Sequence, residues 1–486
     1  MFLCKIFCTK NTCDIISFIS PVYCNSSGIK GINVEKTDRE VDHMQRNLTK
    51  GPITANMLLF AVPLICGNLL QQMYNIADTW IVGRFLGADA LAAVGSSYTL
   101  MTFLTSIILG LCMGSGAAVS IQYGGGKEKK LRQSVFLAFV LIGGICIVLN
   151  VLVFAEMDGI LFILRVPAEI LPLMKEYLRI IFLGIIATFF YNYFANLLRA
   201  IGNSVVPLLF LAVSSVLNVV LDLVCVLHLH MGVEGAALAT VFSQFVSGIG
   251  IFLYAVKKFP QLMPGKEDMH WDPKNLSDIW NLSALTCLQQ SIMNFGILMV
   301  QGLVNSFGTV VMAAFAAAVK IDSFAYMPVQ DFGNAFSTYV AQNFGAGKEE
   351  RIKKGIRSAA LTSAVFCAVI SILVFVFAGP LMQIFIDPEE TEILAVGVQY
   401  LRIEGACYIG IGILFLLYGY YRAINRPGMS VILTVASLGT RVLLAYLLSA
   451  VPAFGVVGIW VSVPIGWALA DLIGIFYLIK SNHKLK

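Results

Sequence analysis

The sequence predicts an all-α polytopic membrane protein, with twelve transmembrane helices in two six-helix lobes that repeat one another in parallel. Three observations lead to this fold class: the composition, a series of long apolar runs, and an internal repeat. Hydrophobic residues make up 58% of the 486 residues and charged residues 13%, and the mean hydropathy is +0.82. Soluble domains carry roughly 25% charged residues. Most of this chain is therefore solvated by lipid rather than by water.

The apolar runs are continuous and reach the roughly 20 residues that a helix needs to cross a hydrocarbon layer about 30 Å thick. Strands of a membrane barrel would instead alternate apolar and polar residues. In the first half we expect spans near 54–82, 88–122, 132–156, 168–197, 205–228 and 233–256. In the second half we expect them near 277–305, 310–343, 355–379, 392–421, 428–450 and 455–479.

Lysine and arginine gather in every second loop and in the tails, whereas the loops between hold only Arg84 and Arg165 beside several acids. The positive-inside rule then predicts that both termini are cytoplasmic, in a protein of the plasma membrane. The orientation of the chain in the membrane also accounts for its net charge of +5. We therefore expect the protein to contact the lipid bilayer and not to bind nucleic acid.

The composition divides the chain into five parts. They are an N-terminal tail at 1–50, a first lobe at 51–257, a cytoplasmic linker at 258–276, a second lobe at 277–480 and a short cytoplasmic tail at 481–486. The N-terminal tail lacks the order of a signal peptide. Because Met44 stands just before the first apolar run, we hypothesise that translation starts there.

The second half repeats the first. Gly-Gly-Gly-Lys-Glu at 124–128 returns as Gly-Ala-Gly-Lys-Glu at 345–349, a shift of 221, and Arg-Ala-Ile at 199–201 returns at 422–424, a shift of 223. Since six is an even number of spans, both copies share one orientation, and a common site is expected near the midplane between them.

Two acids within the spans are the main functional candidates, because a charge in the bilayer centre costs at least about 2.5 kcal/mol. Asp78 lies in the first span; Asp222 lies in the fifth, four residues after Asn218 and on the same helix face. We expect these three residues to form an ion-coupling site for H⁺ or Na⁺. The positions matching the two acids in the repeat are Met299 and Ala445, so the shared architecture does not require acids.

Amides on the inner faces of the spans are candidates for substrate binding, with helix packing as the alternative. They are Gln71, Asn75, Asn192, Asn196, Gln290 and Asn294. Pro63 could act as a hinge in the first span, and Glu404 is the rival for ion coupling. Lys320 and Asp331, eleven residues apart, are expected to neutralise each other or to pair with a neighbouring helix. We expect no cofactor and no metal other than Na⁺.

Several segments together resemble the multidrug and toxic compound extrusion (MATE) family. They are Asn-Leu-Leu-Gln-Gln-Met-Tyr-Asn-Ile-Ala-Asp-Thr at 68–79, Gly-Arg-Phe-Leu-Gly-Ala-Asp at 83–89, Leu-Leu-Arg-Ala-Ile-Gly-Asn at 197–203 and the two Gly-x-Gly-Lys-Glu loops. The resemblance implies a V-shaped central cleft, alternating access, and export of lipophilic, often cationic drugs in exchange for H⁺ or Na⁺.

Within that family, Asp78, Asn218 and Asp222 match the DNA-damage-inducible bacterial branch, and Pro63 matches the first-helix proline that bends in it. The other bacterial branch relies on acids in the seventh and tenth helices, and the seventh span here offers only amides.

Two other functions are open. A flippase for lipid-linked saccharides would share the duplicated architecture but needs a basic cleft, and lysine and arginine are scarce within the spans. A membrane enzyme would need a cluster of catalytic or metal-binding side chains, whereas the five histidines lie in loops, tails or span ends. We therefore expect a transporter of small molecules, not an enzyme, and a monomer.

Overall fold

The computed structural model describes residues 45–163 and 169–484, and these form a single compact unit of helices and turns without strands. Residues 1–44 of the expected tail, and with them the hypothesis about Met44, lie outside the described residues.

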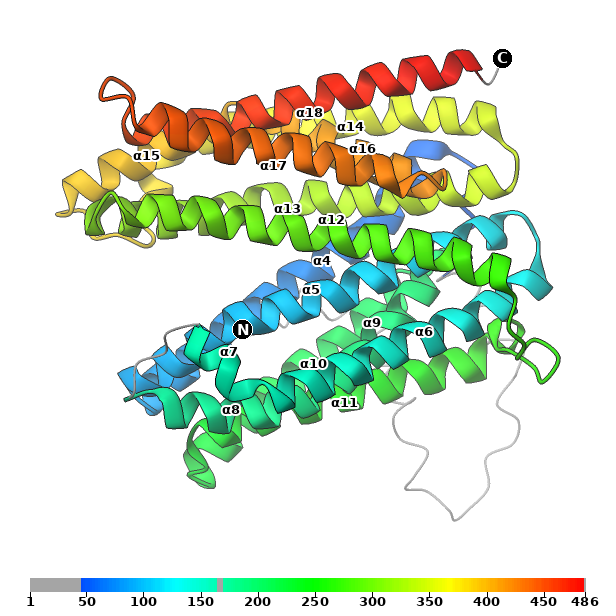
Figure 1. The fold of residues 1–486 in the computed structure, drawn as a ribbon, viewed down its shortest axis with the longest axis horizontal. Helices are drawn as coiled ribbons and strands as arrows, with labels where there is room; N and C mark the ends of the chain where they lie inside the picture. The colour runs from blue at the N-terminus through cyan, green and yellow to red at the C-terminus, as the bar shows by residue number, and fades with distance from the viewer. Residues whose placement is uncertain (1–44, 164–168, 485–486) are drawn as a thin grey trace, which may run out of the picture. The chain divides into compact units, whose positions relative to one another are not determined.

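The first half contains the helices α4 (Ile53–Phe85), α5 (Ala88–Gly124), α6 (Glu128–Ala155), α7 (Met157–Ile163), α8 (Leu171–Leu183), α9 (Ile185–Ala200), α10 (Val205–Leu223), the π-helical turn η1 (Val224–His228) and α11 (Gly232–Lys258) (Figure 1). The second half contains the short 3₁₀ helix η2 (Pro260–Leu262), α12 (Pro273–Asn305), α13 (Thr309–Gly345), α14 (Glu349–Met382), α15 (Thr391–Gly405), α16 (Tyr408–Ala423), α17 (Pro427–Ser449) and α18 (Val456–Lys484).

The prediction of twelve spans is confirmed. In the described residues, ten helices are long and apolar enough to cross a membrane, and two bent pairs complete the set. The fourth span bends by 42° between α8 and α9, and the tenth bends by 52° between α15 and α16. The breaks fall at Gly184 and at Ala406–Cys407, which match at the repeat shift of 223. Hydropathy alone did not reveal these breaks, because the apolar character continues across them.

The repeat is also present in the backbone. Gly87 and Gly308 precede α5 and α13 with φ angles of 90° and 93°, and Gly126 and Gly347 follow the same helices with φ angles of 64° and 67°. These values lie where a side chain would strain the backbone. The two halves therefore turn at equivalent glycines, as expected for a duplicated six-helix unit.

Helix α4 packs against both halves. Met57, Phe60 and Leu64, near its start, belong to the apolar core of the second half. From Gly67 onward α4 lies against α10, where the nearest side chain is that of Leu211. Pro63 lies near the end of the first of these regions, just before Leu64, within one continuous helix. A change in the direction of α4 would thus act on both halves.

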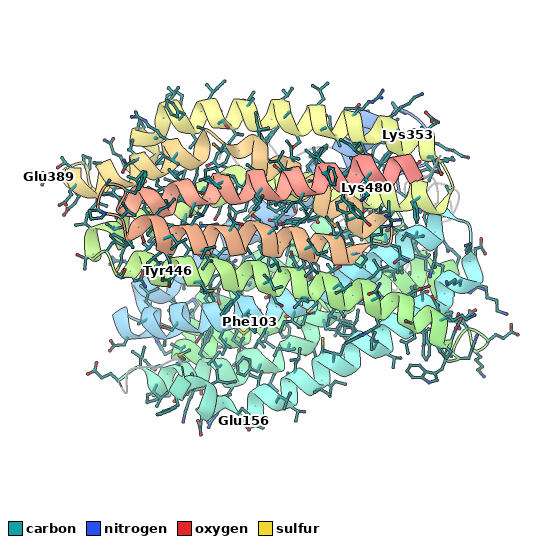
Figure 2. All side chains as sticks on the ribbon, turned by 45° about the horizontal axis from the view of Figure 1, so that its top comes forward. Phe103, Glu156, Lys353, Glu389, Tyr446 and Lys480 are labelled. Carbon is teal, nitrogen blue, oxygen red and sulfur yellow. The ribbon has the colours of Figure 1, made fainter. Side chains whose placement is uncertain are left out.

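Basic residues mark one end of the helix bundle. Figure 2 shows Lys353 and Lys480 at this end and Glu389 at the opposite one. We call it the basic end and define it by residues 127–132 and 348–357. It is the end that the positive-inside rule assigns to the cytoplasm.

At the basic end, α5 and α13 cross in close contact. A Cβ atom on Gly124 would overlap the carbonyl of Gln342, and one on Gly345 would overlap the carbonyl of Ile121. Ile121 and Gln342, like the two glycines, match at the repeat shift of 221. The helix backbones touch because Gly124 and Gly345 lack side chains. The contact is reciprocal, since the glycine of each helix faces the equivalent carbonyl of the other helix.

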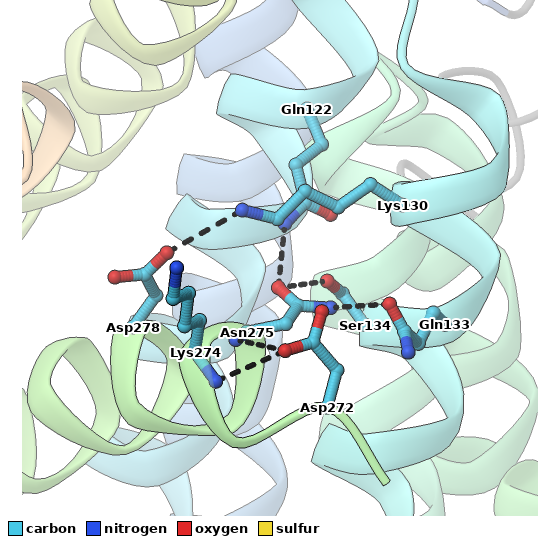
Figure 3. A network of polar contacts seen from close by, with 8 residues as sticks. All are labelled: Gln122, Lys130, Gln133, Ser134, Asp272, Lys274, Asn275 and Asp278. Atoms are coloured by element: carbon cyan, nitrogen blue, oxygen red, sulfur yellow. Dashed lines mark hydrogen bonds and ion pairs between the residues drawn. The ribbon is translucent and has the colours of Figure 1, made fainter. Parts of the chain in front are cut away.

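The expected linker docks on the first half (Figure 3). Asp272 caps α12 by accepting hydrogen bonds from the backbone N–H groups of Lys274 and Asn275. The fully buried Asn275 accepts hydrogen bonds from Gln122 and from Ser134, at 3.3 and 3.0 Å. The linker thus holds the start of α12 against α5 and α6.

Residues 45–51, which we call the strap, connect the two halves at the basic end. In the first half, Gln45 donates a hydrogen bond to the Tyr123 hydroxyl at 2.8 Å. In the second half, Asn343 and Arg351 donate to the carbonyl of Leu48, at 3.1 and 3.3 Å. The Leu48 side chain is fully buried. The end of the expected tail is therefore part of the packed bundle.

Candidate functional site

Two acidic side chains face one another between α4 and α10. Asp222 is fully buried and neither of its carboxylate oxygens has a hydrogen-bond partner; the Oδ1 atom of Asp78 has none either. The two carboxyl groups lie within hydrogen-bonding reach of each other. Two carboxylates are both acceptors, so they can satisfy one another only with a proton or a cation between them.

Asn218 lies one helical turn before Asp222. Its Nδ2 atom donates to the Thr240 hydroxyl on α11 at 3.2 Å, whereas its Oδ1 atom has no partner. The structure thus brings together the three residues predicted for ion coupling, and they offer oxygen atoms of the kind that bind H⁺ or Na⁺. The π-helical turn η1 follows directly after α10, and such turns often occur at functional sites.

The second half has a different arrangement of acids. Met299 is 39% exposed and Ala445 is fully buried, so the positions that match Asp78 and Asp222 hold no charge. Glu404 and Asp322 are buried near Arg441. Arg441 thus offsets part of the charge of Glu404 and Asp322, whereas among the described residues no lysine or arginine forms an ion pair with Asp78 or Asp222.

The hydroxyl of Tyr408 also donates a hydrogen bond to Asp322 at 2.6 Å. Asp322 therefore has a fixed partner as well as a nearby cation. A fixed hydrogen-bond donor and a nearby cation are what we expect around buried acids that hold helices together.

A small cavity of about 100 Å³, partly open to solvent, lies between α4, α5 and α9 of the first half and α13 and α16 of the second. Its polar lining comprises Asn68, Ser120, Asn196, Arg199, Asp331, Asn334, Ser337, Thr338 and Arg422. Leu64, Leu109 and Met113 form its main apolar surface. We call it the central cavity.

A second, smaller cavity shares Met113, Asn334 and Arg422 with the central cavity and adds the amides Gln289, Gln290 and Gln330. Both cavities therefore combine amides with apolar side chains, a lining that can contact many different molecules.

The structure divides the six amides predicted for substrate binding. Asn196 lines the central cavity and Gln290 the smaller one. The remaining four line neither cavity: Gln71, Asn75, Asn192 and Asn294. Two of these four make contacts within their own helices, since Asn75 donates to Gln72 and Asn192 donates to the carbonyl of Thr188.

The two arginines of the central cavity are not among the site residues predicted from the sequence. Arg199 and Arg422 end α9 and α16, where an anchoring charge is ordinary, yet Arg422 is only 6% exposed. The repeated Arg-Ala-Ile was the signal that could have identified them.

Lys320 and Asp331 do not neutralise each other. The Lys320 ammonium lies over the ring of Phe385, 5.8 Å from its centroid. Asp331 instead accepts a hydrogen bond from Asn68 of α4 at 2.6 Å, so it takes the second of its two expected arrangements, a partner on a neighbouring helix.

The MatE family model matches this chain twice, at residues 63–224 and 284–447. The matches begin 221 residues apart and end 223 apart, the same shifts as in the sequence repeat. Each match covers one half, so the family unit itself is present in duplicate.

Several known proteins resemble this chain over most of its length. The probable multidrug resistance protein YpnP of Bacillus subtilis (strain 168) is 30% identical over 393 residues, 80% of this chain and 87% of the relative. The multidrug export protein MepA of Staphylococcus aureus (strain MSSA476) is 24% identical and covers 89% of this chain and 95% of its own length.

A solved structure of an outward-facing multidrug resistance transporter of the MATE family has a TM-score of 0.84 at 22% identity, and covers 90% of this chain and 98% of its own. Another solved MATE structure, in a bent conformation, has a TM-score of 0.83 at 22% identity, and covers 88% of this chain and 95% of its own. The fold is thus that of MATE transporters, two lobes around a V-shaped central cleft. The chain belongs to the MATE family of ion-coupled drug-extrusion transporters.

Proposed function

We propose that this protein is an antiporter of the plasma membrane that exports lipophilic, often cationic compounds in exchange for H⁺ or Na⁺, with both termini in the cytoplasm. The observation that carries the proposal is the pair Asp78 and Asp222. These acids are close together, have oxygens without partners, and are absent from the matching half. An ion that binds between them relieves their repulsion and desolvation.

Helix α4 is the element that transmits this binding to the rest of the molecule. Asp78 lies in the part of α4 that packs on the first half, and the part up to Leu64, which includes Pro63, packs on the second half. Proline frees a backbone carbonyl one turn earlier and permits a bend. An ion that draws α4 toward α10 would therefore move the wall of the central cavity formed by Leu64 and Asn68.

Alternating access then links the two fluxes. When no ion is bound between Asp78 and Asp222, the central cavity takes up a compound from one face of the membrane. When an ion is bound there, the cavity releases the compound at the other face. If one proton replaces one monovalent cation, the exchange is electroneutral, and each pH unit supplies about 1.4 kcal/mol.

Transport in proteoliposomes tests the proposal. Uptake of a lipophilic cationic dye is measured with a pH gradient and a Na⁺ gradient imposed separately. We expect one gradient to drive transport, and Asp78→Asn and Asp222→Asn each to reduce the rate at least tenfold with unchanged reconstitution. Asp89→Asn is the matched control, because Asp89 is exposed at the start of α5. Normal driven transport by either variant would refute the assignment.

A flippase for lipid-linked saccharides is the second candidate, because the central cavity contains Arg199 and Arg422. A diphosphate carries at least two negative charges, whereas Asp331 leaves this cavity an excess of only one positive charge. We therefore expect no acceleration when a fluorescent lipid-linked saccharide is followed by its accessibility to an added reductant. Rapid exchange that Arg422→Gln abolishes would establish the flippase instead.

A further inference from the structure

Arg422 is a buried cation whose direct partners are neutral. Its Nε atom donates to the Ser337 hydroxyl at 3.3 Å and its Nη2 atom donates to Asn334 Oδ1 at 3.0 Å. In the part of the chain that the structure describes, no carboxylate forms an ion pair with it. Burying a charge without a counter-ion is costly, so this position calls for an anion from outside the chain.

Arg199 adds a second cation from the opposite wall of the central cavity. It is the repeat partner of Arg422, and its Nε atom is buried without a hydrogen-bond partner. The charge of Arg199 acts on Asp331, whose Oδ1 atom accepts from Asn68 and whose Oδ2 atom has no partner. Two guanidinium groups and one carboxylate leave one positive charge in excess, together with an acceptor that is free for a donor.

Membrane anchoring does not account for this pair. An arginine that anchors a helix end extends its head into water, whereas the Arg422 side chain is 6% exposed and turned toward the cavity. Both arginines lie in the last turn of a helix, where a cation interacts favourably with the helix dipole. The helix dipole stabilises the two positive charges, but the Nε–H donor of Arg199 still has no hydrogen-bond acceptor.

We propose that the central cavity binds the carboxylate of an amphipathic compound, with Arg422 and Arg199 as the donors. The free oxygen of Asp331 would accept a hydrogen bond from an ammonium or N–H group of the same molecule, and Leu64 and Leu109 would contact its apolar part. The preferred ligand is thus a zwitterionic amphiphile rather than a simple lipophilic cation. This inference rests on the proposed function, because it assumes that the central cavity holds the exported compound.

A matched pair of dyes tests the inference with the purified full-length protein. Rhodamine 110 carries a free carboxylate, and rhodamine 123 is its methyl ester with the same ring system. Fluorescence anisotropy titrations give the dissociation constant of each dye. We expect the wild-type protein to bind the acid about tenfold more tightly than the ester, as a charge-assisted contact predicts.

Substitutions then assign the preference to the arginines. Arg422→Gln and Arg199→Gln should each bring the ratio of the two dissociation constants close to one, mainly by weakening the acid. Arg422→Lys retains the charge and should retain part of the preference. Arg402→Gln is the matched control, since Arg402 is exposed and lies over the ring of Phe375 at 5.6 Å from its centroid. Thermal unfolding shows whether each variant is folded.

Equal binding of the two dyes by the wild-type protein would overturn the inference, as would a preference for the acid that survives in folded Arg422→Gln. If anionic lipid added to the detergent displaces rhodamine 110 competitively, the site binds a lipid headgroup and the substrate assignment is wrong. These outcomes are separate from ion coupling. Gradient-driven export of the ester with no preference for the acid would leave the proposed function intact.

Discussion

Asp268 is the residue that fixes the linker to the first half. Its Oδ2 atom accepts hydrogen bonds from Arg132 Nε at 2.8 Å and from the backbone N–H of Gly265 at 3.0 Å, and the residue is 4% exposed. Burial alone would raise the pKa of Asp268, but the hydrogen bonds from Arg132 and Gly265 lower it below the ordinary value. The carboxylate therefore stabilises the fold in its charged form.

We predict that Asp268→Asn lowers the free energy of unfolding by about 1 kcal/mol at pH 7, through the loss of a charge-assisted hydrogen bond. Because the folded-state pKa is lowered, the stabilisation is present above the ordinary pKa and disappears as the pH falls through the folded value. Thermal unfolding in detergent at pH 7 and at pH 3 measures the loss of stability in the variant. The variant and the wild type should differ more at pH 7 than at pH 3; an equal difference at both values would contradict the assignment.

Among single residues, the sequence draws attention to the acids more readily than to the cations. Asp78 and Asp222 stand out because an acid within an apolar run can be recognised from the sequence alone. Arg199 and Arg422 do not, because each ends its own helix and resembles an ordinary anchoring charge. Their position on opposite walls of one cavity depends on how the two halves pack, and hydropathy contains no information on that packing.

Among the elements, α5 and α13 make a close contact between the halves that involves both helix backbones. It depends on Gly124 and Gly345, each of which faces a carbonyl of the other helix. The sequence showed these glycines as part of a repeated loop. Their second role, close approach of two helices far apart in the sequence, is visible only in the fold.

We predict that Gly124→Ala or Gly345→Ala forces the helices apart and favours the conformation that is open at the basic end. Spin labels at positions 129 and 353, both exposed, should report a longer distance between the halves in each variant. Gly95→Ala, also in α5, is the control, because a Cβ atom there meets nothing within 4 Å. A distance distribution identical to that of the wild type would show that the crossing tolerates a methyl group.

At the scale of the whole molecule, the strap closes the basic end by binding both halves at once. Its contacts to Tyr123 belong to the first half, and those to Asn343 and Arg351 belong to the second. A structure open at the basic end must break one of these sets. Breaking either set costs free energy, so the strap stabilises the state that is closed at the basic end.

We predict that Leu48→Ala loosens this closure, because it removes a fully buried side chain at a cost of about 2–4 kcal/mol. Hydrogen exchange should rise at the ends of α5 and α13, in residues 118–124 and 339–345. Leu59→Ala is the matched control, since Leu59 is 49% exposed on α4. Unchanged exchange in Leu48→Ala would mean that the crossing alone holds the end closed.

Most of the architecture could be predicted from the sequence, because lipid requires long apolar helices and the repeat gives their relative orientation. The ends of the spans were less predictable. The helices α12 and α14 begin at Pro273 and Glu349, before the expected starts at 277 and 355, because polar residues continue the helices beyond the apolar runs. The strap was expected to be a tail, because its polar sequence gives no sign of the surfaces that it binds.

The reciprocal contact between Gly124 and Gln342, and between Gly345 and Ile121, has the form of an isologous dimer interface, in which one patch meets a copy of itself. An ancestral six-helix chain could have made the same contact with a second copy before the two were fused. In such a symmetric dimer both copies would carry the same acids. Fusion allowed them to differ, so that Asp78 and Asp222 persist on one side while Met299 and Ala445 occupy the other. The covalent linker thus made it possible for the two halves to differ at these positions while the shared interface was retained.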